Sequence, residues 1–303
     1  MIQEISVDNI NDIRPLIERY NKQGPEVQLP ENFAEQVKTS ISENKACFYG
    51  AYSDHGSIRG IALFGRESKR INFVFADGDL ETEKLLITAL FDRFSQESPY
   101  IAAGGLWISE DLAEHIQSIG FGRHDRMHMS LSREDIEVLD DPTLPDGMSF
   151  EPYCPELREE ICEVVFDGND GHVDQNIFPE FFGTVDACRS FLENIETNRY
   201  GEYRDALSWI LRRDGRAIGA CFMTVRNGDM GYIPDIVVNK EFRGQKLGRA
   251  ILVHSMKRLL ESDSDLIKIE LDVTLSNIAR FLYESLGFTK LQEYTLYTWK
   301  KSS

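Results

Sequence analysis

The two halves of this 303-residue chain repeat the same order of elements. Hydrophobic periodicity and turn residues predict, in each half, a strand and helix, three strands joined by hairpin turns, a long helix, a strand and a short helix. Both halves then end alike, with Gly120-Phe121 or Gly287-Phe288 leading into a final strand. Any two α/β domains look alike at this level, but the shared ending favours duplication. We therefore predict an α/β (α+β) fold of two tandem domains, each a mixed central sheet flanked by helices.

The acidic segment 132–147, SREDIEVLDDPTLPDG, is the best candidate for the linker between these domains. It contains six carboxylates, two prolines and a glycine, and it has no sustained periodicity. The predicted boundaries are therefore a first domain over 1–131, a linker over 132–147 and a second domain over 148–303.

Composition narrows the class of protein. The formal net charge of −18 disfavours a nucleic-acid partner and would attract a cationic substrate, although it can also serve only solubility. No apolar run approaches the ~20 residues of a membrane helix, and no secretory signal is recognisable. Five scattered cysteines indicate reduced thiols in a cytoplasmic protein, with neither a disulfide framework nor a metal site.

The segment Arg243–Ala250, RGQKLGRA, carries the strongest chemical signal. It lies between a predicted strand, GYIPDIVVN, and an amphipathic helix that begins near Leu247. A glycine-containing loop before a helix N-terminus points backbone N–H groups at an anion, and glycines let the backbone approach phosphate oxygens. Three cations within it reverse the sign of an otherwise acidic chain. We interpret this loop as a polyphosphate site, the alternative being a basic helix start with incidental glycines.

A second motif follows about thirty residues later, in the segment 277–288, NIARFLYESLGF. Together the two motifs resemble those of the GCN5-related N-acetyltransferase family, whose loop reads R/Q-x-x-G-x-G/A and whose later segment reads N-x-x-A-x-x-L-Y-x-x-x-G-F. The residue types of the later segment are all present, with Asn277 one place closer to Ala279 than the pattern has it, and the resemblance covers essentially all of 148–303. Lys246 departs from the pattern because it stands where the loop usually has its first glycine. We expect a lysine to fit this turn if its φ stays negative.

The resemblance implies an acyl-CoA site in the second half and assigns residues to it. Amides of the loop would hold the pyrophosphate, the strand before it would pair with the pantetheine arm and polarise the thioester carbonyl, and Asn277 would bond the pantetheine. The implied coenzyme contacts are Ile236, Val237, Val238, Arg243, Gly244, Gln245, Lys246, Leu247, Gly248, Arg249, Asn277, Arg280 and Tyr283. The implied activity is transfer of an acetyl (acyl) group from acetyl-CoA to a primary amine by direct attack in a ternary complex, without a metal.

That chemistry needs a base and an acid. Amines have a pKa of about 10, so a base must take the proton before attack, and the departing thiolate leaves better if an acid protonates it. Tyr283 is our candidate acid, unless it only packs the last helix. Asp235 is the preferred base, although Pro234 could turn it into a bend residue. Asp272 is the second candidate, whereas His254 and His172 are more typical of a packing histidine and a solvated loop histidine.

The first half lacks these groups. Its equivalent loop, residues 77–83, reads DGDLETE, and its four carboxylates would repel pyrophosphate. Glu110 and Ile116 stand where the second half has Asn277 and Tyr283. We predict a degenerate, acetyltransferase-like domain without the coenzyme motif, which packs on the active one.

The acceptor is the least determined part. In proteins with this resemblance, the stretch 166–206 would form much of the acceptor site, and its aromatic rings and carboxylates would suit a small cationic amine, unless the rings are core and the acids solvated. Its aromatic candidates are Phe178, Phe181, Phe182, Tyr200 and Tyr203. Alternatives are a protein or peptide amine as acceptor, a catalytically silent acyl-CoA-binding regulatory module, and an aminoacyl transferase that uses charged tRNA.

Overall fold

The computed structural model describes residues 1–23, 28–105, 108–204 and 207–301. The chain divides into two compact units. The first unit comprises Met1–His124 and Tyr294–Ser303, and the second comprises Asp125–Glu293.

The sheet of the first unit has the strand order β1-β2-β3-β4-β5-β12. Neighbouring strands are antiparallel except β4 and β5, which are parallel. Its elements are β1 (Ile2–Glu4), η1 (Val7–Ile13), α1 (Arg14–Lys22), α2 (Phe33–Ser42), β2 (Ala46–Tyr52), β3 (Ile58–Gly65), β4 (Arg70–Phe75), α3 (Leu80–Phe94), β5 (Tyr100–Gly104) and α4 (Glu110–Ser118), with parts of β6 (Gly122–Ser132) and β12 (Thr289–Lys300).

The second unit repeats this arrangement in the order β7-β8-β9-β10-β11-β6. Again all neighbours are antiparallel except one parallel pair, β10 and β11. Its elements are α5 (Arg133–Glu137), β7 (Met148–Pro152), η2 (Pro155–Leu157), α6 (Arg158–Asn169), α7 (Val173–Ile177), α8 (Pro179–Phe182), α9 (Val185–Glu196), β8 (Trp209–Arg213), β9 (Arg216–Arg226), β10 (Met230–Val238), η3 (Lys240–Phe242), α10 (Leu247–Ser262), β11 (Lys268–Thr274) and α11 (Ala279–Ser285), with the remaining parts of β6 and β12. The predicted pair of mixed sheets flanked by helices is confirmed.

The last strand of each sheet comes from the other half of the sequence, which differs from the predicted boundaries. Residues 126–132 of β6 pair with β11 in the second unit, although the sequence placed 126–131 in the first domain. Conversely, residues 296–300 of β12 pair with β5 in the first unit. The physical reason is burial, because Met127, Met129 and Leu131 belong to the apolar core of the second unit.

The acidic segment 132–147 is also more than a linker. Its first residues form α5, in which Ile136 is fully buried in the core of the second unit. Arg133 donates hydrogen bonds to the carbonyls of Leu260 at 3.2 Å and Leu266 at 2.9 Å. A cation here satisfies carbonyls at the end of α10, where the helix dipole is negative.

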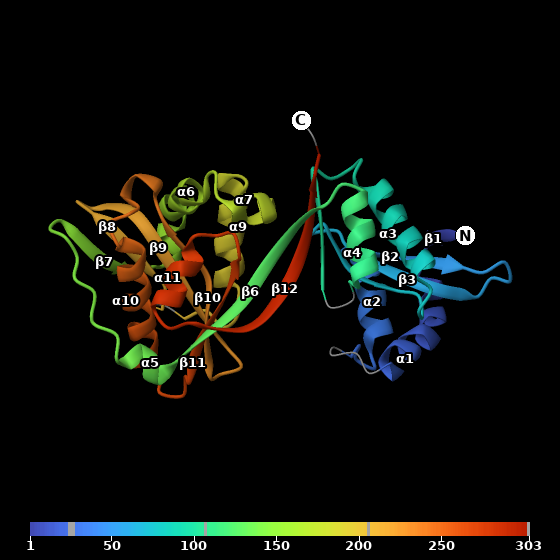
Figure 1. The fold of residues 1–303 in the computed structure, drawn as a ribbon, viewed down its shortest axis with the longest axis horizontal. Helices are drawn as coiled ribbons and strands as arrows, with labels where there is room; N and C mark the ends of the chain where they lie inside the picture. Colours follow the sequence, from blue (N-terminus) through green and yellow to red (C-terminus); the bar gives the residue numbers. More distant parts are fainter. Residues whose placement is uncertain (24–27, 106–107, 205–206, 302–303) are drawn as a thin grey trace. The chain divides into compact units, whose positions relative to one another are not determined.

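In the second unit, helices cover both faces of the sheet (Figure 1). The apolar stripe of α10, with Ile251, Leu252 and Leu259 fully buried, packs with α11 on one face. On the other face α6 and α9 enclose a second core around Phe191 and Phe222.

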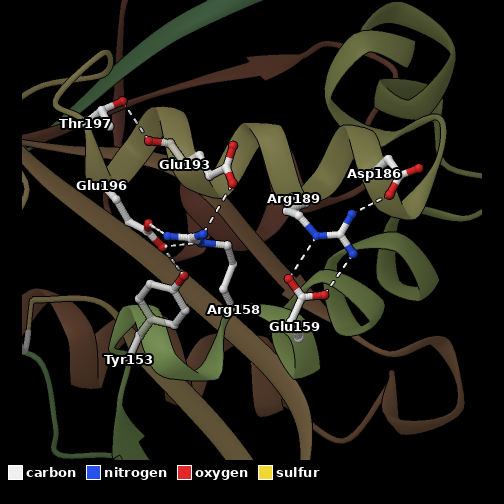
Figure 2. Close-up of polar contacts among 8 residues, drawn as sticks. All are labelled: Tyr153, Arg158, Glu159, Asp186, Arg189, Glu193, Glu196 and Thr197. Atoms are coloured by element: carbon white, nitrogen blue, oxygen red, sulfur yellow. Dashed lines mark hydrogen bonds and ion pairs between the residues drawn. The ribbon is translucent and has the colours of Figure 1, made fainter.

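Figure 2 shows the polar contacts that join α6 to α9. Glu196 accepts hydrogen bonds from the Tyr153 hydroxyl at 2.6 Å and from Arg158, whose second partner is Glu193. Further along, Arg189 on α9 makes two hydrogen bonds to Glu159 on α6, at 2.9 and 2.8 Å.

In the first unit, a carboxylate of the chain itself occupies the start of α3. The Asp79 carboxylate caps the helix by accepting from the Thr82 amide at 3.1 Å and hydroxyl at 2.7 Å, and Arg59 pairs with it at 2.7 Å. Asp77 pairs with Arg19 at 2.8 Å. The Thr82 amide at the start of α3 is therefore already hydrogen-bonded to a carboxylate of the chain.

None of the described helices is both long and apolar enough to cross a membrane. Within the described ranges, no group of three or more His, Cys, Asp or Glu side chains is arranged to hold a metal ion.

Candidate active site

The two central strands of the second unit separate part of the way along. β10 pairs with β11 only from Met230 to Ile233, whereas it continues along β9 as far as Val238. A bulge lies between Tyr232 and Asp235, around Pro234, where a residue without an N–H is tolerated. The carboxyl-terminal part of β10 is thus an unpaired edge facing the gap to β11.

Strand alternation shows which backbone groups face this gap. The Asn239 amide donates to the Ile218 carbonyl of β9 at 2.9 Å. Because backbone groups of an antiparallel pair alternate in direction, those of Val237 also face β9, whereas those of Ile236 and Val238 face away from it. Val238 therefore supplies an amide at the open edge of β10.

The predicted loop between β10 and α10 has the backbone of an anion-binding turn. Gly244 has a φ of +76° and Lys246 a φ of +62°, and no described side chain caps α10 at Lys246. The condition under which a lysine was expected to fit this turn, a negative φ, is therefore not met. A left-handed lysine costs roughly 1–2 kcal/mol, which explains why a glycine suits this position better.

Gly248 lacks any internal reason to be glycine. A Cβ there would make only ordinary contacts, at 3.7 Å from Leu282 and 4.0 Å from Val238. Its φ is not positive, in contrast to Gly244. The open surface beside Gly248 is what a polyphosphate lying on the first turn of α10 would require.

The cations of the loop divide into two groups. The Arg243 guanidinium is tied to backbone carbonyls, Val238 at 3.2 Å and Gly168 at the end of α6, so it fastens the loop to the protein. Lys246 and Arg249 make no ion pair with any described residue. Gln245 is exposed, and the side chain of Leu247 is buried in the core, leaving its amide at the helix start.

Asp235 lies at the bulge of β10, beside the gap. Burial and the nearby carboxylate of Asp174 raise its pKa to about 7, against a hydrogen bond from Asn169. Its Oδ2 atom is buried and has no hydrogen-bond partner among the described residues. Asp235 is therefore a strand residue that can accept a proton near neutral pH.

Tyr283 on α11 is 7% exposed, and its ring meets that of Phe288 edge to face at 5.9 Å. Burial, followed by the charges of Asp235 and Asp174, raises the pKa of its hydroxyl, which keeps it protonated. The two residues predicted as base and acid are thus close enough to influence each other's charge.

Asp174 on α7 is the centre of the polar contacts in this region. The sequence offered it only as one of the carboxylates of the stretch 166–206 that would suit a cationic acceptor, and did not predict its contacts with other segments. Its carboxylate accepts from the Thr274 hydroxyl at 2.6 Å and the Asn277 amide at 2.8 Å, and it pairs with Arg126 at 3.4 Å and His172 at 3.6 Å. The Asn277 side chain also accepts from the amide of Ala279, the first residue of α11, at 2.8 Å, so it contacts both the start of this helix and Asp174. No spacing in the sequence relates α7 to β6 and β11, which meet only in the folded unit.

The remaining candidates take structural positions. Asp272 accepts from the Tyr232 hydroxyl at 2.9 Å and contacts His128 at 3.2 Å. His254 stacks on Phe150 at 4.0 Å, as expected for a packing histidine. Arg280 lies over the Phe281 ring at 4.8 Å and pairs with Glu284 at 3.3 Å.

The aromatic stretch 166–206 is largely core, apart from Asp205 and Ala206, which lie outside the described residues. Phe182 is 6% exposed, and Phe178, Phe181, Tyr200 and Tyr203 pack against the same apolar cluster. The Arg126 guanidinium covers the Phe178 ring at 4.7 Å. These rings therefore belong to the apolar core beside α7, the helix on which Asp174 lies.

Comparisons with known proteins agree with this geometry. Residues 175–288 match the model of the acetyltransferase (GNAT) family. A 70-residue segment is 37% identical to N-alpha-acetyltransferase 30 of Dictyostelium discoideum, and it covers 23% of this chain and 37% of that protein. The match thus spans little more than a third of this curated relative.

Among solved structures, a GCN5-related N-acetyltransferase from Sphaerobacter thermophilus superposes with a TM-score of 0.60 at 16% identity, over 99% of this chain and 95% of the other. A tandem GNAT protein from the clavulanic acid biosynthesis pathway gives 0.59 at 14% identity, over 100% and 99% of the two chains. At these identities the likeness shows the fold alone. The second unit therefore contains a segment that matches the acetyltransferase (GNAT) family, and the chain shares the fold of these solved structures.

Proposed function

We propose that the second unit transfers an acetyl (acyl) group from acetyl-CoA to a primary amine, by direct attack in a ternary complex. The observation that carries the proposal is the convergence of an uncapped helix N-terminus, an open strand edge and the pair Asp235 and Tyr283. Each part matches one need of the reaction: a polyphosphate site, a pairing edge for an extended chain, and a base with an acid.

The donor would lie along the gap between β10 and β11. Amides of residues 245–249 would hold the pyrophosphate, with Lys246 and Arg249 supplying charge that no described carboxylate neutralises. The pantetheine arm would extend along the edge of β10. The outward amide of Val238 would bond the arm or the thioester carbonyl, where it would stabilise negative charge developing on oxygen.

The proposed reaction forms one bond, breaks another and moves two protons. The amine nitrogen bonds to the thioester carbonyl carbon and its proton passes to Asp235, then the carbon–sulfur bond breaks and the thiolate takes a proton from Tyr283. Protonation of Asp235 removes a negative charge that raises the pKa of Tyr283. The base therefore makes the acid stronger at the stage when the thiolate leaves.

The first unit would not bind the donor. Its α3 start holds Asp79 as an internal cap where the second unit has free amides. A carboxylate at this point repels phosphate and removes the donors that phosphate would use. We propose that this unit is a degenerate partner of the catalytic one.

Calorimetry with acetyl-CoA tests the donor site. We expect one site per chain, abolished by Gly248→Glu, which places bulk and negative charge on the first turn of α10. A control is Gly78→Glu, in the equivalent loop of the first unit, which strains a backbone with a φ of +82° but should leave binding unchanged. Two equivalent sites would contradict a degenerate first unit.

Thiol release across a panel of amines then tests the reaction. Small diamines are expected to be the best acceptors because the chain is strongly acidic. The segment similar to N-alpha-acetyltransferase 30 favours a second candidate, a peptide N-terminal amine, so short peptides belong in the panel. Binding without thiol release from any amine would instead support a silent acyl-CoA-binding module.

A further inference from the structure

Asp174 connects three segments that are distant in the sequence: α7, β6 and the stretch from the end of β11 to α11. It lies on α7 with a side chain that is only 19% exposed, and its partners come from β6, from the end of β11 and from the residues before α11. Thr274, Asn277 and Arg126 are themselves 1%, 7% and 7% exposed. A buried carboxylate with several donors stays ionised, and its pKa is indeed lowered despite burial, helped by His172 and Arg126.

This negative charge lies near Asp235. Ile233 of β10 is opposite Leu271 of β11, so Asp235 is level with the end of β11, where Thr274 donates to Asp174. The titratable groups around Asp235 are Asp174 on α7, His172 immediately before α7, Tyr283 on α11, and the thiols of Cys188 on α9 and Cys221 on β9. Among these neighbours, Asp174 is the one that is ionised and of like sign. Two nearby carboxylates in different environments are driven to different protonation states.

We propose that Asp174 is the positioning residue of this site, which fixes Thr274 and Asn277 at the end of β11 and places a negative charge beside Asp235. It does not touch the reacting atoms and acts through Asp235 and α11. Because α7 lies in the stretch 166–206 that the family resemblance assigns to the acceptor and α11 carries Tyr283, this one carboxylate would set the geometry of both. The part concerning catalysis rests on the proposed function, with Asp235 as base.

Asp174→Asn separates charge from hydrogen bonding. The amide keeps an oxygen that can accept from Thr274 or Asn277, but it removes the negative charge near Asp235. Carboxyl-carbon NMR titration of the full chain, with the Asp235 signal assigned by Asp235→Asn, should show a midpoint near 7 in the parent protein. In Asp174→Asn we expect that midpoint to fall by about one pH unit, because a like charge has been removed.

Asp167→Asn is the matched control. Asp167 is an exposed carboxylate at the end of α6, so its loss changes the net charge equally but should leave the Asp235 midpoint in place. An Asp235 midpoint that does not move in Asp174→Asn, with the melting temperature retained, overturns the proposal. If that variant does not fold, Asp174→Glu, which keeps the charge, is measured instead, and a midpoint below that of the parent overturns the proposal.

The acid limb of the kcat/KM profile gives the second readout. It should move to lower pH with the NMR midpoint in Asp174→Asn, whereas a purely structural role would lower kcat without moving the limb. A shifted midpoint with an unshifted limb supports the electrostatic link and removes Asp235 as the base. The NMR result stands even if no amine is acetylated, so the two proposals fail separately.

Discussion

At the scale of the residue, Tyr283 gives the most direct test of the proposed chemistry. Tyr283→Phe keeps the ring and its contact with Phe288 but removes the hydroxyl, so we expect kcat to fall by about 10²–10⁴-fold, the usual range for general acid catalysis. The Kd for acetyl-CoA and the melting temperature should change little. The effect should shrink with a donor whose thiol has a lower pKa. An unchanged kcat, with chemistry limiting the rate, would reduce Tyr283 to a packing residue.

Lys246 combines backbone strain with a useful charge, and two substitutions separate them. Lys246→Gly relieves the left-handed backbone and should stabilise the second unit by about 1 kcal/mol, while affinity for acetyl-CoA falls by about threefold to tenfold as one charge-assisted contact is lost. Lys246→Gln should lose the same affinity without the gain in stability. Thermal melts and calorimetry measure both, and equal stability of the two variants would contradict the strain argument.

At the scale of the element, the pair α6 and α9 depends on one buried carboxylate (Figure 2). The Glu196 side chain is 9% exposed and serves Tyr153 and Arg158, so Glu196→Gln should lower the free energy of unfolding by about 2–3 kcal/mol. Glu159→Gln breaks an ion pair between the same helices in which Glu159 is 70% exposed, and it should cost less than about 1 kcal/mol. Similar losses in denaturant unfolding would refute the distinction.

The packing of α10 against β7 and β8 predicts how stability depends on pH. Burial lowers the pKa of His254 to about 4, from about 6.5 in the unfolded chain. Its stabilising contribution is therefore complete above about pH 6.5 and is lost as pH falls toward 4, amounting to about 1–2 kcal/mol after allowance for partial exposure. His254→Phe should remove that part of the acid sensitivity. If the free energies of unfolding of the two proteins fall by the same amount between pH 7 and 4.5, His254 is not responsible for the acid sensitivity.

At the scale of the whole molecule, the exchanged strands make each unit depend on the other half of the chain. Truncation after Glu293 removes residues 296–300, which pair with β5, and takes Tyr297 from the core of the first unit. We expect the amides of Tyr100–Gly104 to lose protection from hydrogen exchange, while those of β10 and β11 keep it. Truncation after Lys300 is the control, since every β12 pair with β5 remains. Retained protection of β5 in the shorter protein would mean that the strand is dispensable.

Much of the fold follows from local patterns. The repeat from Gly120-Phe121 to Gly287-Phe288 was visible in the sequence, as were the helix that begins at Leu247 and the strand before it. Periodicity reports which side of an element is apolar, but not which sheet it completes. The exchange of β6 and β12 was therefore not predictable, because either copy of the final strand fits either sheet by pattern alone.

The sequence by itself determined the family resemblance, the glycine loop and the candidates Asp235 and Tyr283, because each is fixed by residue type at short spacing. Only the tertiary structure decided that Lys246 is left-handed, that Arg243 binds carbonyls and that Asp174 meets Thr274 and Asn277. The physical reason is that charge and hydrogen bonding act through space. Asp174 and Thr274 are 100 residues apart in the chain, and only folding places their oxygens 2.6 Å from each other.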